Sequence, residues 1–127
     1  MADPEFLIDS NIAIYVLGDA LCLPARKLQT MPVGAVVTSA IVYAEVLRRI
    51  PIGKNDARRQ AEALFALIPA LPFEAAHAAT YSLIPCKRHR FDHLIAAHAL
   101  SLDLTLVTNN EGDFADVPGL KVENWTV

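Results

Sequence analysis

The chain has 127 residues, enough for a single domain over residues 1–127, and its 54% of hydrophobic residues exclude an intrinsically disordered protein. The net charge of -3 excludes a uniformly basic nucleic-acid clamp, so contact with RNA would need local basic patches or bound cations. Since no apolar run reaches the roughly 20 residues of a membrane span and no basic signal peptide opens the chain, we expect a cytoplasmic protein without membrane contact.

Short apolar runs alternate with helical patterns along the chain. The predicted strands lie at residues 6–8, 35–38, 71–73, 104–108 and 120–122. The predicted helices lie at residues 12–17, 21–30, 40–50, 56–68, 75–84 and 91–102. Ser39 is expected to cap the third helix and Asn55 or Asp56 the fourth, while Pro72 places the third strand at a sheet edge.

This alternation predicts an α/β fold of three layers, α/β/α, with a mostly parallel central sheet of about five strands. Continuous apolar strands are typical of a parallel sheet that helices cover on both faces. In such sheets, ligands bind at the carboxyl ends of the strands. Residues just past the predicted strand ends are therefore the first candidates for a functional site.

Three aspartates stand at predicted strand ends or at the starts of the helices that follow, namely Asp9, Asp92 and Asp113. Each also has an ordinary explanation. Asp9 can cap a helix, Asp92 can interact with a helix dipole, and Asp113 can be a turn residue. A doubly wound sheet can bring these positions to one edge, so we expect the three carboxylates to share a site.

Glu45 is the only charged residue between Gly34 and Leu47, in a predicted helix that is apolar on nearly every face. A carboxylate in such surroundings is costly unless it is paired, bound to metal or placed in a cleft. An ion pair with Arg48 or Arg49 is the simplest alternative. Otherwise Glu45 joins the three aspartates in one site.

Four neighbouring carboxylates without counter-charge would repel one another, and a divalent cation removes that conflict. Oxygen ligands favour Mg²⁺ or Mn²⁺, and these ions suit phosphodiester hydrolysis. We expect Asp9, Asp92 and Asp113 to hold the metal. Glu45 would bind it directly or through water and orient the attacking water. The side chains expected to support these ligands by hydrogen bonds are Ser10, Asn11 and Thr108.

At these residues the chain resembles the PIN-domain nucleases, and within them the VapC toxins of type II bacterial toxin–antitoxin pairs. The matching segments are residues 7–11, 38–46, 92–100, 106–110, 113–114 and 117–125. They follow the family's order and cover nearly the whole chain. One departure is that the segment before Asp92 is shorter than usual and lacks the glycine typical of the family.

The resemblance implies a PIN-like fold, Mg²⁺- or Mn²⁺-dependent endoribonuclease activity, a homodimer, and inhibition by a cognate antitoxin that links the toxin to operator DNA. The family's acidic set carries over onto Asp9, Glu45, Asp92 and Asp113, with Glu111 as a second candidate for the last position. Two alternatives stay open: a PIN nuclease of RNA maturation without an antitoxin, and an inactive PIN module that only binds RNA or a partner.

A basic segment, Lys87, Arg88 and Arg90, lies just before the third acid. It is a candidate for binding RNA phosphates beside the metal, although a solvated basic loop explains it equally well. Tyr15 and Tyr43 are the aromatic candidates for stacking on bases, but we expect both to pack in the interior.

Overall fold

The computed structural model describes residues 2–86 and 91–127. Its five strands form one sheet in the order β3-β2-β1-β4-β5, and each neighbouring pair is parallel. The strands are β1 (Phe6–Ile8), β2 (Val36–Ser39), β3 (Ala70–Leu71), β4 (Thr105–Val107) and β5 (Val122–Glu123). The predicted α/β fold with a parallel sheet of about five strands is confirmed.

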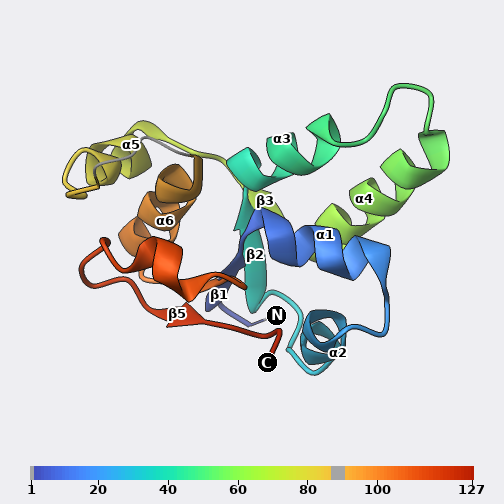
Figure 1. The fold of residues 1–127 in the computed structure, drawn as a ribbon, viewed down its shortest axis with the longest axis horizontal. Helices are drawn as coiled ribbons and strands as arrows, with labels where there is room; N and C mark the ends of the chain where they lie inside the picture. Colours follow the sequence, from blue (N-terminus) through green and yellow to red (C-terminus); the bar gives the residue numbers. More distant parts are fainter. Residues whose placement is uncertain (1, 87–90) are drawn as a thin grey trace.

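Six α-helices and one 3-10 helix connect these strands in the described residues. They are α1 (Ser10–Gly18), α2 (Leu23–Gln29), α3 (Ala40–Arg48), α4 (Asn55–Leu67), α5 (Ala75–Tyr81), α6 (Phe91–Ser101) and η1 (Glu111–Phe114). The chain moves outward from β1 to β3 and then crosses back to β4. Because such crossovers are right-handed, this reversal puts α1 and α4 on one side of the sheet and α5 and α6 on the other (Figure 1).

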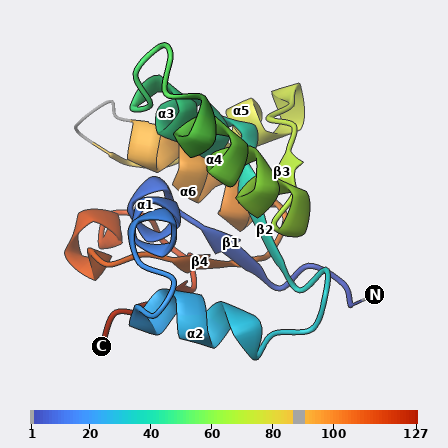
Figure 2. The same ribbon diagram turned by 90° about the vertical axis from the view of Figure 1, so that its right-hand side faces the viewer.

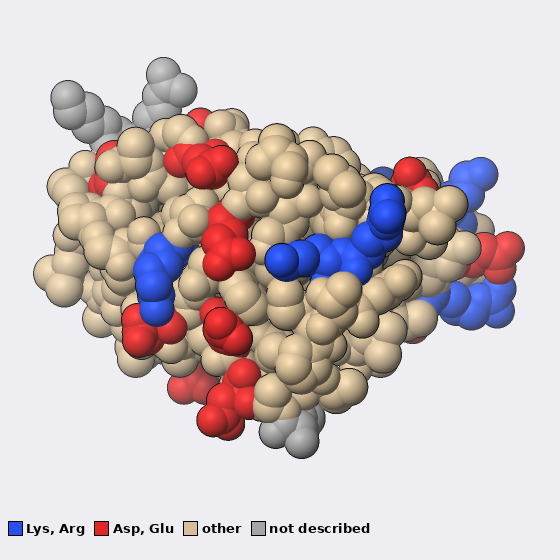
Figure 3. Space-filling model, turned by 90° about the horizontal axis from the view of Figure 1, so that it is seen from below, with Lys and Arg blue, Asp and Glu red and all other residues tan. Residues whose placement is uncertain are grey.

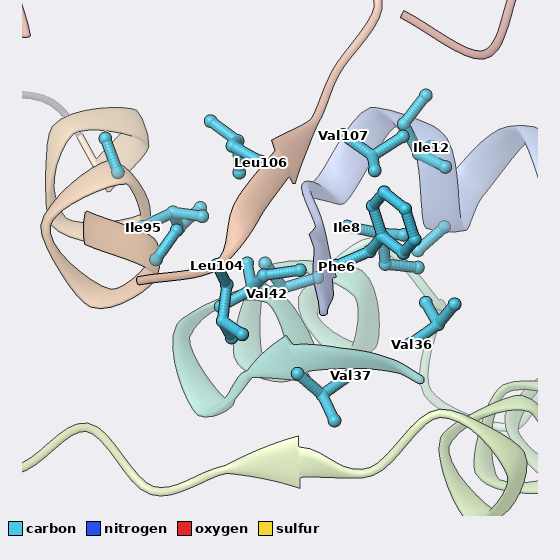
Figure 4. Packing of buried hydrophobic residues seen from close by; sticks show 14 of the residues in the cluster. Phe6, Ile8, Ile12, Val36, Val37, Val42, Ile95, Leu104, Leu106 and Val107 are labelled. Atoms are coloured by element: carbon cyan, nitrogen blue, oxygen red, sulfur yellow. The ribbon is translucent and has the colours of Figure 1, made fainter. Parts of the chain in front are cut away.

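Packing in the core explains why β1 is entirely apolar and why β4 is apolar after its first residue, Thr105. Leu7 and Ile8 of β1 and Leu106 of β4 are completely buried, because helices cover both faces of these central strands. Ile12 of α1 and Ile95 of α6 are also completely buried, and Figure 4 shows their side chains on opposite sides of the sheet. The helices on the two sides of the sheet therefore pack into one continuous hydrophobic core.

Two predicted helix caps have different outcomes. The Ser39 hydroxyl accepts a hydrogen bond from the Ile41 amide at 3.1 Å and caps α3, as expected. The predicted cap of α4 by Asn55 or Asp56 is wrong. That helix begins at Asn55 itself, with no side-chain cap, and Asp56 instead forms an ion pair with Arg59 one turn later.

The chain ends shape the surface near α2. In both views the C-terminus lies beside this helix (Figures 1 and 2).

Two strands begin at other residues than predicted. The last strand begins at Val122, two residues later than predicted, and the third strand begins at Ala70, one residue earlier than predicted. Within the described ranges, no helix is long and apolar enough to cross a bilayer.

Candidate active site

A pocket of about 180 Å³ opens at the carboxyl ends of β1 and β4. These strands are neighbours, and the direction of the chain connections reverses between them. Such a switch point is where open α/β sheets bind ligands. All four predicted acids line this pocket: Asp9, Glu45, Asp92 and Asp113.

Asp9 lies at the base of the pocket, where β1 passes into α1. Its carboxylate accepts a hydrogen bond from the Ile12 amide at 3.1 Å, so it caps α1. Only 7% of the residue is exposed. Burial raises its pKa from 3.8 to about 6, hydrogen bonds from the Thr108 hydroxyl and the Ile12 amide oppose this rise, and the negative charge of Asp92 adds to it. The Asp9 carboxylate therefore both caps α1 and lines the pocket.

Glu45 projects from α3 and is half-buried. Its Oε1 accepts a hydrogen bond of 2.7 Å from the Ser10 hydroxyl on α1. Among the ion pairs of the described residues, none joins Glu45 to Arg48 or Arg49. The expected alternative of a local ion pair is therefore wrong, and Arg49 lines the pocket as a separate positive group.

Asp92 and Asp113 reach the pocket from the other half of the molecule. Asp92 lies in the first turn of α6, as the sequence predicts. Asp113 lies in η1, and its Oδ2 accepts a hydrogen bond of 2.7 Å from the Asn110 side chain. Glu111, the other candidate for this position, is not among the described residues that line the pocket.

Two of the three predicted supporting residues, Ser10 and Thr108, bond directly to an acid, whereas the Asn11 side chain bonds to Asn109. Ser10 holds Glu45, and Asn11 donates to the Asn109 side chain at 3.3 Å. Thr108 is completely buried at the end of β4. Its hydroxyl bonds to Asp9 and accepts from the Asn110 amide at 3.1 Å, so it ties β1 to the turn that carries Asp113.

The donor chemistry of the pocket fits a hydrated divalent cation. In the part of the chain that the structure describes, no three His, Cys, Asp or Glu side chains stand close enough to hold an ion by themselves. Mg²⁺ usually retains several waters and takes only one or two carboxylates from the protein. Asp9 and Asp92 meet that need, because their charges are close enough to raise the pKa of Asp9. Asp113 lines the same pocket as Asp9 and Asp92.

Two features of the pocket were missed in the sequence. The sequence suggests only an ion-pair role for Arg49, whereas this residue lines the pocket. Asn110 orients Asp113, and its place three residues earlier in the same polar turn was the available signal. The predicted phosphate-binding segment, Lys87, Arg88 and Arg90, lies outside the described residues.

The surface charge is divided rather than uniformly basic. On the face drawn in Figure 3, acidic side chains form a band across the middle, with Lys and Arg side chains on both sides. This distribution agrees with the net charge of -3. A phosphate ligand near the acidic residues would therefore need a cation as counter-charge.

Comparison with known proteins agrees with this geometry. Residues 6–120 match the family model of the PIN domain. The tRNA(fMet)-specific endonuclease VapC of Shigella flexneri is 29% identical over 133 residues, which cover 96% of this chain and 98% of that protein. Ribonuclease VapC1 of Haemophilus influenzae is 30% identical over 131 residues, covering 95% and 98%.

A solved structure supports the same relationship. VapBC-1 from nontypeable Haemophilus influenzae aligns with a TM-score of 0.79 and 26% identity, covering 96% of this chain and 98% of that one. The family match extends over most of the chain and includes the strands, helices and turn that carry all four acids. The chain belongs to the PIN domain family, and within it to the VapC ribonucleases.

Proposed function

We propose that this chain is a Mg²⁺- or Mn²⁺-dependent endoribonuclease, the toxin of a VapBC-type toxin–antitoxin pair. The observation that carries the proposal is the pocket at the ends of β1 and β4, where four carboxylates from four separate segments meet. The ribonuclease names of its relatives support RNA as the substrate. The whole chain, residues 1–127, acts as one nuclease domain in this proposal.

Asp9 and Asp92 are the proposed direct metal ligands, and Asp113 would hold the hydrated ion through water. With a pKa of about 6, Asp9 is mostly ionised at pH 7.5 and ready to act as a ligand. When bound, Mg²⁺ or Mn²⁺ supplies positive charge that stabilises the reacting phosphate and makes water more acidic. Glu45, held by Ser10, would orient the attacking water. Arg49 would contact the phosphate at the wall of the same pocket.

Thr108 and Asn110 are the proposed positioning residues. Thr108 bonds to Asp9 and to the Asn110 amide, and Asn110 bonds to Asp113. This chain of contacts connects Asp9 with Asp113 through the buried Thr108 and the exposed Asn110. A fixed arrangement of this kind lowers the cost of collecting like charges around one ion.

Cleavage of single-stranded RNA by purified, antitoxin-free protein tests the proposal. Mg²⁺ or Mn²⁺ should support cleavage and EDTA should stop it. Asp9→Asn and Asp92→Asn should each lower the rate at least about 100-fold, since each removes a charged ligand worth several kcal/mol. Asp103→Asn is the matched control, because Asp103 is exposed and precedes β4, at the opposite end of the strands. Cleavage that survives both ligand substitutions would refute the assignment.

A cognate antitoxin is the proposed protein partner. The related structure from nontypeable Haemophilus influenzae is that of VapBC-1. In this chain, a largely apolar pocket of about 380 Å³ lies between α1, α2 and α4. Val33 and Leu67 in its lining are each 78% exposed, and exposed apolar patches commonly mark protein interfaces. As the family resemblance implies, the antitoxin should block RNA cleavage at equimolar concentration.

The homodimer and the operator-DNA complex formed through the antitoxin stay predictions from the family resemblance. Light scattering and a DNA-binding assay with and without antitoxin test them. We place the site of action in the cytoplasm, where RNA is available and where the two free cysteines, Cys22 and Cys86, would stay reduced.

A further inference from the structure

A second pocket, of about 330 Å³, lies next to the candidate active site. It is lined by Tyr15, Cys22, Leu23, Pro24, Asn109 and Thr126, and is called the Tyr15 pocket below. Tyr15 and Asn11 are four residues apart on α1, so they share one face of that helix. Since Asn11 lines the catalytic pocket, the two pockets are neighbours along α1.

A chain of side-chain hydrogen bonds connects the pockets. The Asn11 amide donates to Asn109 Oδ1 at 3.3 Å, and the Asn109 amide donates to the Tyr15 hydroxyl at 3.0 Å. Asn109 directly follows Thr108, which bonds to Asp9. The Tyr15 ring is therefore held by a residue attached to the base of the catalytic pocket.

The position of Tyr15 contradicts the expectation that it packs in the interior. It is 42% exposed, whereas Tyr43 is partly buried and packs against Phe65 with ring centroids 4.8 Å apart. An exposed hydrogen bond between Asn109 and Tyr15 contributes little to folding. Holding an aromatic ring at the surface beside a catalytic pocket is better explained by a ligand.

The chemistry of the Tyr15 pocket favours a flat, uncharged ligand with polar edges. All six lining residues are uncharged, which disfavours a phosphate or a metal ion. Tyr15 supplies an aromatic surface, and Leu23 and Pro24 supply apolar contacts. An Asn side chain has two donor hydrogens and two acceptor lone pairs. Asn109 uses one of each in the bonds above, so one donor and one acceptor remain for a ligand edge.

We propose that the Tyr15 pocket binds one unpaired base of the RNA substrate, next to the phosphate that is cleaved at Asp9. The inference rests on the proposed function. The base would stack on the Tyr15 ring and bond through one edge to Asn109, the usual way in which proteins recognise single-stranded RNA. Asn11 and Tyr15, which line the two pockets, are about one helical turn apart on α1, a distance that one ribose-phosphate unit can span.

Kinetics with three variants test the role of Tyr15. Tyr15→Leu should raise the KM for a short single-stranded RNA about 10-fold, with little change in kcat, because stacking is lost while the carboxylates are untouched. Tyr15→Phe should retain most of the affinity. Leu21→Ala is the control, since Leu21 is 78% exposed and does not line the pocket. Equal KM values for wild type and Tyr15→Leu would overturn the proposal.

Abasic substrates provide a second, independent readout. Single abasic sites are placed in turn at positions flanking the cleaved bond. At one position, removing the base should weaken binding to wild type about as much as Tyr15→Leu weakens binding of the intact RNA. Tyr15→Leu should then bind this abasic RNA only slightly more weakly than wild type does. Additive losses at every position would overturn the base-binding role.

The outcomes separate the two proposals. If wild type does not cleave RNA with Mn²⁺, the proposed function fails. If wild type cleaves and Tyr15→Leu behaves identically, only the Tyr15 pocket fails. If Tyr15→Leu weakens antitoxin binding and leaves the KM for RNA unchanged, the pocket is a protein contact and the base-binding proposal is refuted.

Discussion

Replacing Asp9 by asparagine should stabilise the metal-free protein above pH 6, although it removes a proposed metal ligand. Burial raises the pKa of Asp9 to about 6, against 3.8 for the free side chain. Well below pH 3.8 the carboxyl is protonated in both folded and unfolded chains, so it has no effect on stability. Between pH 4 and 6 the unfolded chain ionises first, and stability falls as pH rises. Above pH 6 the carboxyl is ionised in both states, and the loss of stability caused by its burial no longer changes with pH.

The size of this penalty follows from the two pKa values. The difference between 3.8 and about 6 corresponds to about 3 kcal/mol of unfolding free energy. Asparagine remains neutral and is as good a helix cap as aspartate, so the bond from the Ile12 amide should persist. In EDTA at pH 8, Asp9→Asn should therefore raise the midpoint of thermal unfolding by on the order of 10 °C.

Thermal unfolding of wild type, Asp9→Asn and the exposed control Asp3→Asn measures this effect at pH 4 and pH 8. The gain should be present at pH 8, nearly absent at pH 4, and absent from the control at both. Mn²⁺ at pH 8 should stabilise wild type and have little effect on Asp9→Asn, because ligand binding to the folded state raises stability. An Asp9→Asn protein less stable than wild type at pH 8 would refute the reasoning.

Three further predictions concern the support of the site and the core. Thr108→Val should cost about 1–3 kcal/mol in urea unfolding, because it leaves the Asn110 amide without its acceptor, whereas Thr108→Ser should cost much less. Burial, and then the neighbouring His77, lower the pKa of His98 from 6.5 to about 4. The contribution of His98 to stability should therefore fall as the pH drops from 6.5 to 4, opposite in sign to that of Asp9, and an NMR titration of His98 with a midpoint near 6.5 would contradict this. Ile95→Ala should cost about 3 kcal/mol by leaving a cavity, while Leu83→Ala, at an 83% exposed residue, should cost under about 0.5 kcal/mol.

The central sheet was predictable because strands buried on both faces consist of consecutive apolar residues. The apolar run Phe6–Ile8 is the observed β1 without adjustment. The convergence of Asp9 with Asp92 and Asp113 followed from the rule that parallel strands present their carboxyl ends at one edge. The short strand β3 lies at an edge of the sheet, as Pro72 predicts, and begins one residue earlier than expected.

Contacts between distant side chains were not predictable. Glu45 has arginines three and four residues away, and local spacing favours those pairs, yet its partner is Ser10 on another helix. The exposure of Tyr15 depends on how α2 and the C-terminal residues lie against α1, which periodicity does not report. Burial of His98 likewise depends on the packing of α5 on α6. The centroids of the His98 and His77 rings are 4.2 Å apart at this contact.

The most direct test of the account is the rate of RNA cleavage as a function of Mn²⁺ concentration, for wild type and Asp92→Asn. Asp92 is preferred over Asp9 for this test because it lies within the first turn of α6, whereas Asp9 is the N-cap of α1. The account predicts metal-dependent cleavage by wild type and a rate lower by at least about 100-fold for the folded variant at every Mn²⁺ concentration. Equal rates for the two proteins, or wild-type cleavage that persists in EDTA, would contradict it.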